Sequence, residues 1–236
     1  MTSELQPSEP LWDGDHVLAL HSCTETLAVG VQSLEAGSGG TSTPAVATFP
    51  LGRALSNEIF DCVESILPAS AWPRLRRLAV ATGPGGFTGT RLTVVLARTL
   101  AQQLQLPLDG FSDFLLMARG VRASQEFQST TRFWMVREQP RRGIVAGLYD
   151  WDHPSGTFIE SRPPRLFADR AELSAIAEAE HVPAISRLPE DLLELLRLSR
   201  AAAAAARPAR WQSVLPIYPT SPVDRAVAGM SLRRGG

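Results

Sequence analysis

Few residues of this chain have the types and spacing that chemistry needs, and a glycine-rich turn is the most informative group. Gly83, Gly85 and Gly86 follow the apolar run Leu78–Ala81, and Thr88 precedes a stretch with helical apolar spacing. Backbone N–H groups at such a strand-to-helix turn can bind a phosphate, and the Thr88 hydroxyl is expected to cap the helix. A tight turn also needs glycines for its dihedral angles alone. Spacing leaves both interpretations open.

The histidines and cysteines do not form a recognisable metal motif. No two histidines are i, i+4 partners, and none is paired with a cysteine at the spacing of metal ligands; the histidines are His16, His21, His153 and His181. The last three are interpreted as surface or turn residues. Cys23 and Cys62 lie outside any C-x-x-C pair and are expected to be free thiols. We therefore predict no catalytic residue and no metal ligand.

The composition excludes some further classes of protein. The 236 residues include no Lys, which excludes a lysine Schiff base and a P-loop. A net charge of -1 gives no overall attraction to nucleic acid or to an acidic membrane. The first fifteen residues lack the features of a signal peptide, and no run approaches the roughly 20 apolar residues of a membrane span. A cytoplasmic protein is expected.

The elements that must position the turn have an α/β pattern. Short apolar runs predict an antiparallel meander of three strands, followed by a helix, a buried strand, the turn and a second helix; the ranges are 17–20, 27–31, 45–49, 53–67, 78–81 and 90–104. A less regular second half follows, with helices at 114–121, 169–180 and 189–206 and strands at 132–136, 144–149 and 157–161. We predict a flexible leader (1–15), a first domain (16–112), a smaller second domain (113–222) and a disordered tail (223–236).

The helix after the turn is apolar over an unusually wide arc. At 100° per residue, its leucines and alanines cover roughly 200°, about twice the stripe that one sheet needs. The excess predicts a partner protein or a second copy, although burial under the second domain is the alternative. The side chains placed near that interface, on this helix and the one before it, are Leu55, Ile59, Val63, Leu92, Leu96 and Leu100.

The turn and its surroundings resemble the TsaB (YeaZ) family. The run from Val80 to Arg91, Val-Ala-Thr-Gly-Pro-Gly-Gly-Phe-Thr-Gly-Thr-Arg, is similar to the family signature G-x-G-P-G-S-F-T-G-x-R, with Gly86 at the usual Ser. Leu18–Glu25 resembles the family's opening strand and turn, and Leu106–Ser112 resembles its strand after the signature helix. The likeness extends over residues 16–118.

The resemblance implies a fold and a function. The fold would be α/β and actin-like or sugar-kinase-like (ribonuclease H-like), with mixed sheets flanked by helices in two related subdomains. The chain would be a non-catalytic partner of TsaD, which transfers threonylcarbamoyl to adenosine 37 of tRNA. TsaE would join the complex, the chain could also form a homodimer through the same helices, and tRNA would be reached through the complex. The chain would need no cofactor of its own, although a nucleotide could occupy the TsaB–TsaD interface.

Several residues depart from the family pattern. His21 stands where the family has Asp, an acid that places metal and phosphate in catalytic relatives, and Leu55 replaces the His before Ser56. The second domain shows only fragments of the family's motifs, at Arg142-Gly143 and at Pro216–Tyr218.

Three alternatives stay open. The first is a TsaD-like or ATP-dependent transferase or metallopeptidase. The second is a dinucleotide-binding domain that uses Asp109, about 20 residues after the turn, for a ribose. The third is a scaffold of the same fold with another partner.

Overall fold

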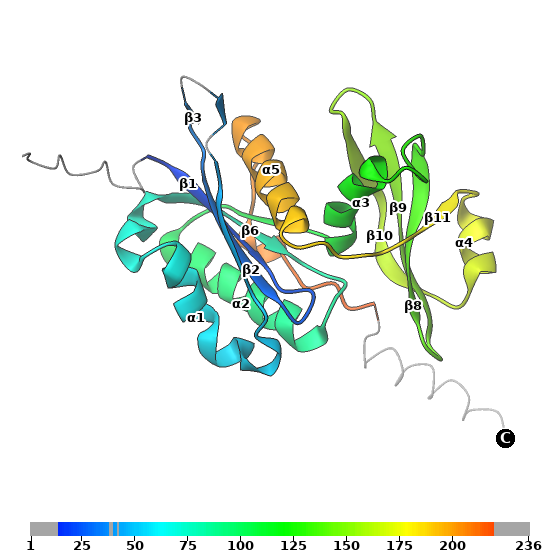
Figure 1. The fold of residues 1–236 in the computed structure, drawn as a ribbon, viewed down its shortest axis with the longest axis horizontal. Coiled ribbons are helices and arrows are strands. Elements are labelled where there is room, and N and C mark those ends of the chain that lie inside the picture. The colour runs from blue at the N-terminus through cyan, green and yellow to red at the C-terminus, as the bar shows by residue number, and fades with distance from the viewer. Residues whose placement is uncertain (1–13, 38–39, 42, 220–236) are drawn as a thin grey trace, which may run out of the picture.

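The computed structural model describes residues 14–37, 40–41 and 43–219. The predicted tail and all but the end of the predicted leader lie outside this range. Two sheets lie side by side, each flanked by helices (Figure 1). Within the described residues, no helix is long and apolar enough to cross a membrane.

The first sheet has the order β5-β2-β1-β6-β7. Its strands are β1 (His16–His21), β2 (Leu27–Ser33), β5 (Ala45–Phe49), β6 (Leu75–Ala81) and β7 (Leu108–Phe111). The first three form the predicted antiparallel meander, and β6 and β7 run parallel to β1. Between β2 and β5, the two-residue strands β3 (Ala36–Gly37) and β4 (Gly40–Thr41) pair with each other.

Helices cover both faces of this sheet. On one face lie α1 (Leu55–Ile66) and α2 (Phe87–Leu104), and on the other lies α5 (Glu190–Ala204). Because side chains alternate along a strand, Leu18 and Leu20 pack with α1 and α2, whereas Val17 and Ala19 pack with α5. Short 3₁₀ helices, η1 (Gly52–Ala54) and η2 (Ala69–Arg74), flank α1.

The second sheet has the order β10-β9-β8-β11. Its strands are β8 (Arg132–Gln139), β9 (Gly143–Asp152), β10 (Thr157–Phe167) and β11 (Glu180–Pro183). One face packs on α3 (Asp113–Ala123) and the other on α4 (Arg170–Ile176). The helix predicted over 169–180 ends at Ile176, because Glu180–Pro183 pairs with β8 as a parallel strand.

The two halves share one topology. A three-stranded meander leads to a helix and then to a strand parallel to the first one: β1-β2-β5, α1 and β6 in one half, and β8-β9-β10, α4 and β11 in the other. The helix that follows β11 is α5, which packs on the first sheet. The segment after α5 also returns there, since Leu108 donates to the Ala209 carbonyl and Ile217 to that of Thr82. The predicted second domain, 113–222, therefore contains two parts that pack on the first domain: helix α5 and the C-terminal segment after it.

Candidate functional site

The glycine-rich turn packs tightly on the loop between β1 and β2. A Cβ added at Gly85 would lie 2.3 Å from the Cys23 carbonyl oxygen, and Gly83 has a φ of 96°. The Gly86 N–H donates to that same Cys23 carbonyl at 2.8 Å. Glycine is thus required at Gly83 by its dihedral angle and at Gly85 by close approach. One N–H that could have faced a phosphate is already hydrogen-bonded within the chain.

The start of α2 differs from the prediction. Its N-cap is Gly86, which makes no side-chain capping hydrogen bond. Thr88 is exposed and lies inside the first turn of the helix. The prediction that Thr88 caps this helix was wrong, because the helix begins at Phe87, three residues before the predicted start.

Beside the turn lies a buried pair of ionisable side chains, His21 and Asp113. His21 ends β1, Asp113 begins α3, and their side chains are fully buried with Nε2 and Oδ1 2.7 Å apart. The interpretation of His21 as a surface or turn residue was therefore wrong. The sequence gives little sign that His21 is paired with Asp113, because the two residues lie 92 positions apart along the chain.

Cys23 completes this group. Its Sγ and one ligand atom from each of His21 and Asp113 all lie within 4.8 Å of one another. Burial raises the pKa of the Cys23 thiol well above its usual value, and the negative charge of Asp113 raises it further. Cys23 and Cys62 are free thiols, as predicted, and both are buried.

Arg137 connects the second domain to the turn. It extends from β8, donates from Nη1 to the Pro84 carbonyl at 2.8 Å, and lies 3.7 Å from Asp113 Oδ2. Its guanidinium also lies over the Phe114 ring, 5.0 Å from the centroid. This single side chain therefore contacts both halves of the molecule.

A polar cavity of about 380 Å³ lies between the two sheets, beneath the C-terminal segment. Ser112 donates to Glu160, and the Tyr149 hydroxyl donates to the same carboxylate at 3.1 Å. Burial raises the pKa of Tyr149, and Glu160 raises it further. The sequence does not predict this network. Tyr149 and Glu160 are cross-strand neighbours on β9 and β10, but Ser112 lies 37 or more positions away, at the start of α3.

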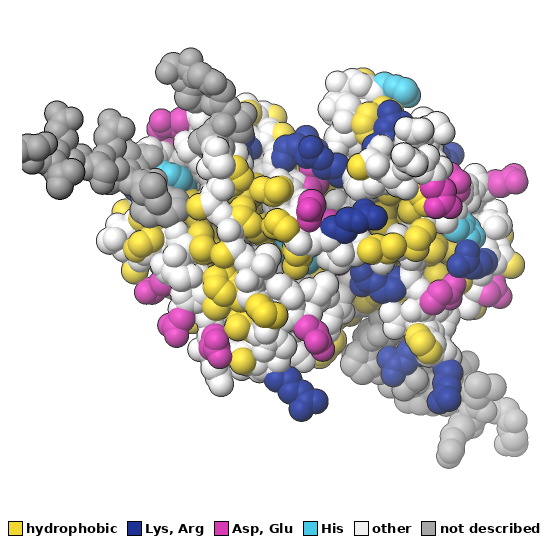
Figure 2. Space-filling model, viewed as in Figure 1, with side chains coloured by type: hydrophobic (Ala, Val, Ile, Leu, Met, Phe, Trp, Pro, Cys, Tyr) yellow, Lys and Arg dark blue, Asp and Glu magenta, His cyan; other side chains and the backbone are white. Residues whose placement is uncertain are grey.

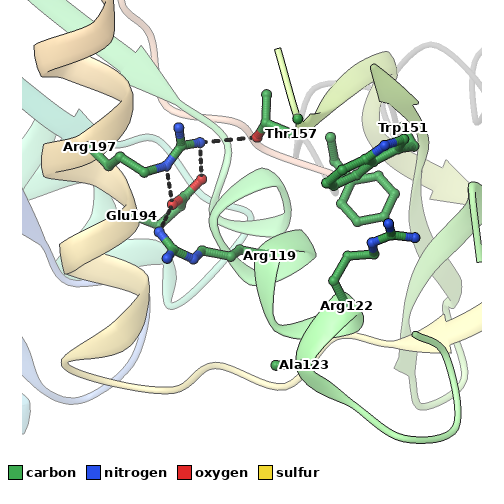
Figure 3. Close-up of a pocket in the computed structure, with 9 residues that line it drawn as sticks. Arg119, Arg122, Ala123, Trp151, Thr157, Glu194 and Arg197 are labelled. Carbon is green, nitrogen blue, oxygen red and sulfur yellow. Dashed lines mark hydrogen bonds and ion pairs between the residues drawn. The ribbon is translucent and has the colours of Figure 1, made fainter. Parts of the chain in front are cut away.

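A second pocket, of about 430 Å³, lies between α3, α5 and the second sheet (Figure 3). Glu194 of α5 is almost fully buried and accepts hydrogen bonds from Arg119 of α3 and from Arg197. On the opposite side, Arg122 lies over the Trp151 ring at 4.2 Å. Arg119 and Arg197 already bind the Glu194 carboxylate, so the contact between Arg119 and Glu194 chiefly joins α3 to α5.

Asp109, the candidate ribose-binding acid, has another role. It accepts two hydrogen bonds from Arg77, at 2.6 and 2.8 Å, and one from Ser199. Both charged side chains are less than a tenth exposed. Asp109 is therefore already occupied by contacts with β6 and α5.

The structure corrects the choice of side chains for a partner interface. Five of the six predicted residues are at most 8% exposed and pack in the chain's own core: Leu55, Ile59, Val63, Leu96 and Leu100. Leu92 is half-buried. The wide apolar arc is covered partly by the 3₁₀ helix η3 (Trp211–Ser213), whose Trp211 packs on this core beneath Arg98.

Other apolar side chains of the same helices stay exposed. Phe60 of α1 and Val95 of α2 are 50% and 49% exposed, and Leu104 is also exposed. Phe87, at the start of α2, is exposed and lies 5.1 Å from the Tyr218 ring. Figure 2 shows hydrophobic side chains on the surface of the first domain with acidic side chains around them. Those of α1 are Glu58, Asp61 and Glu64, all exposed.

Comparison with known proteins gives relatives named for tRNA threonylcarbamoyladenosine synthesis. A family model described as TsaD, tRNA N6-adenosine threonylcarbamoyltransferase, matches residues 43–129, well under half of the chain. The tRNA threonylcarbamoyladenosine biosynthesis protein TsaB of Escherichia coli (strain K12) is 31% identical over 142 residues, 56% of this chain and 58% of that protein. TsaB of Bacillus subtilis (strain 168) is 32% identical over 77 residues, 33% of this chain and 31% of that protein. The chain therefore spans less than two thirds of either relative.

Solved structures agree on the fold. An uncharacterised protein with similarity to the peptidase YeaZ, from Pseudomonas aeruginosa, superposes with a TM-score of 0.64 at 18% identity, over 87% of this chain and all of that one. YeaZ from the same organism gives a TM-score of 0.62 at 18% identity, over 86% of this chain and 99% of that one. The expected fold class, an actin-like α/β fold with mixed sheets flanked by helices, is confirmed.

Proposed function

Because the chain is related to the TsaB (YeaZ) family in sequence and fold, we propose that it is a non-catalytic subunit for tRNA N6-threonylcarbamoyladenosine synthesis. In this role it binds TsaD and supports its activity at adenosine 37, with TsaE as a further member of the assembly. The names of the two curated relatives support the pathway. The observation that carries the proposal is the apolar surface that α1 and α2 leave exposed.

The outer surface of α1 and α2 has the composition of a docking surface. Phe60 and Val95 are each about half exposed, and large apolar side chains at the centre of an interface supply much of its binding energy. Glu58, Asp61 and Glu64 add negative charge along α1. A partner that fits would present apolar side chains beside basic ones.

The contacts around the glycine-rich turn support a non-catalytic role. An acid that would hold metal and phosphate is replaced by His21, whose Nε2 already contacts Asp113. Gly85 and Gly86 close on Cys23, and Arg137 extends toward the same place from the second domain. These contacts hold the glycine-rich turn against the loop after β1, with Gly85 and Gly86 exposed to solvent.

Co-purification with TsaD of the same organism tests the docking surface. The double variant Phe60→Arg, Val95→Arg should reduce complex formation at least about tenfold, because it places two charges where apolar contact is needed. Ile159→Arg is the matched control, since Ile159 is 48% exposed but lies on β10 of the second domain. Ile59 and Leu96, one residue away, are unsuitable because both are buried.

The result is read by size-exclusion chromatography and calorimetry on folded variants. Loss of TsaD binding in the double variant with normal binding by Ile159→Arg supports the proposal. If the wild type, the double variant and Ile159→Arg all bind TsaD equally well, the assignment of this surface is contradicted. Reconstituted tRNA modification by TsaD and TsaE, with and without this chain, tests the function itself, and equal rates would contradict it.

A TsaD-like transferase is the second candidate, favoured by the family model that matches residues 43–129 and by the His21, Cys23 and Asp113 group. The isolated chain would then hydrolyse ATP or modify tRNA without TsaD. Turnover by homogeneous protein that is lost in Asp113→Asn would favour this alternative over a supporting subunit.

A further inference from the structure

We propose that His21, Cys23 and Asp113 form a binding site for a divalent metal ion of the zinc type. Each residue contributes one ligand atom, and the three atoms lie within 4.8 Å of one another. They come from the end of β1, the loop after it and the first residue of α3. The inference goes beyond the proposed function and does not depend on TsaD.

Two atoms of this group lack the hydrogen bonds that burial normally requires. Among the described residues, His21 Nδ1 and Asp113 Oδ2 are buried side-chain atoms without a hydrogen-bond partner. Leaving such an atom unsatisfied in the interior disfavours the folded state. Both side chains are 0% exposed, so water at the protein surface does not compensate. A bound cation would satisfy part of this unmet polar capacity.

The ligand set selects the class of metal. Imidazole nitrogen, thiolate sulfur and carboxylate oxygen together are typical of Zn²⁺, with three protein ligands and a fourth position for water. Calcium and magnesium prefer oxygen ligands throughout. On binding, the Cys23 S–H bond breaks, a sulfur–metal bond forms and the proton passes to solvent. The charge of the metal then stabilises a thiolate that burial alone disfavours.

The surrounding backbone holds the three ligands in place. The Cys23 carbonyl accepts from Gly86 N–H at 2.8 Å, and the Asp113 N–H donates to the Gly83 carbonyl at 2.6 Å. Because Gly85 admits no Cβ beside Cys23, the turn fixes the loop that carries the sulfur. The glycine-rich turn thereby has a function here other than phosphate binding, since it positions metal ligands.

Arg137 places a positive charge beside the three ligands, and its position is compatible with a metal. It lies 3.7 Å from Asp113 Oδ2, and its side chain is 28% exposed, so solvent partly screens it. Carboxylates that bind a metal are commonly held by a second partner of this kind. Arg137 would then orient Asp113, while the Nε2 contact of His21 adjusts to the ion.

Metal content and cobalt spectroscopy test the site. Full-length protein is unfolded with a chelator and refolded with Zn²⁺ alone or with Co²⁺ alone, and excess metal is removed. Wild type should retain about one zinc ion per chain, and Cys23→Ser below about a tenth of that. The matched control is Cys62→Ser, which removes the other buried thiol, on α1, and should retain zinc like the wild type.

If Cys23→Ser does not refold, the cobalt spectra of wild type and Cys62→Ser still show whether the Cys23 thiolate binds the metal. A thiolate-to-cobalt charge-transfer band should appear in wild type and in Cys62→Ser. Circular dichroism confirms that each protein is folded. The proposal is overturned if refolded wild type retains no zinc, if folded Cys23→Ser retains as much as wild type, or if the cobalt band disappears in Cys62→Ser.

Discussion

At the scale of single residues, the buried ion pair between Arg77 and Asp109 joins distant parts of the chain. Arg77 and Asp109 lie on neighbouring strands, and Ser199 of α5 donates to the same carboxylate at 2.6 Å. Arg77 also donates to the carbonyl of Arg207, beyond the end of α5. This charge-assisted network therefore attaches α5 and the chain after it to the first sheet.

Asp191, at the start of α5, is a buried acid whose charge opposes folding. Burial raises its pKa from 3.8 to about 6, although hydrogen bonds from the Arg187 N–H and the Ser186 hydroxyl favour the ionised form. The pKa of Asp191 is higher in the folded protein than in the unfolded chain. The protonated Asp191 therefore contributes fully to the free energy of unfolding below about pH 4, and this contribution is lost as the pH rises through about 6.

Asp191→Asn should therefore gain stability relative to wild type as the pH rises. The difference in unfolding free energy should move in favour of the variant by about 2–3 kcal/mol between about pH 4 and pH 7, since each pKa unit is worth about 1.4 kcal/mol. Urea denaturation at several pH values measures it. Asp61→Asn, at an exposed site on α1, is the control and should show no such trend. A constant difference for Asp191→Asn would contradict the raised pKa.

At the scale of elements, η3 explains how α2 hides its wide apolar arc. Trp211 packs against the core beneath α2, and Arg98 lies over its ring, 5.7 Å from the centroid. Periodicity correctly predicted that a single sheet could not cover α2. It could not identify what covers the rest, because the covering residue lies more than a hundred positions later in a Pro-rich segment without regular spacing.

Trp211→Ala should destabilise the protein by about 2 kcal/mol. A fully buried Trp truncated to Ala costs about 3–5 kcal/mol, and Trp211 is only partly buried. Hydrogen exchange should increase in α2 more than in α4, which packs on the other sheet. Gln212→Ala is the neighbouring control, as Gln212 is exposed. An unchanged midpoint of unfolding would show that η3 contributes little to covering α2.

At the scale of the whole molecule, the first domain depends on chain from the far end of the sequence. α5 contacts β1, β2 and β6, and Val17 and Ala19 pack in the same cluster as its leucines. A fragment ending at residue 112 should therefore be insoluble or partly unfolded. Adding back a fragment of residues 113–219 during refolding should restore native circular dichroism. A stable, monomeric 1–112 fragment would contradict this dependence.

How much the sequence could predict varied with the range of the contacts. The meander, α1, α2 and the glycine-rich turn were predicted because their periodicity is local, and the family resemblance extended to them. β11 was missed because four residues at Glu180–Pro183 become a strand only by pairing with β8. His21 and Asp113 could not be paired from sequence, since only the fold brings β1 and the start of α3 together.

The position of α5 also has a consequence for protein synthesis. A ribosome that has completed β7, at Phe111, must add about 90 more residues before α5 is complete, which takes roughly 5–20 s at ordinary rates of synthesis. Throughout that interval the nascent first sheet has one uncovered apolar face. The newly made chain therefore requires protection from aggregation until α5 emerges, and a stop codon introduced just before Glu190 would leave a product for proteolysis.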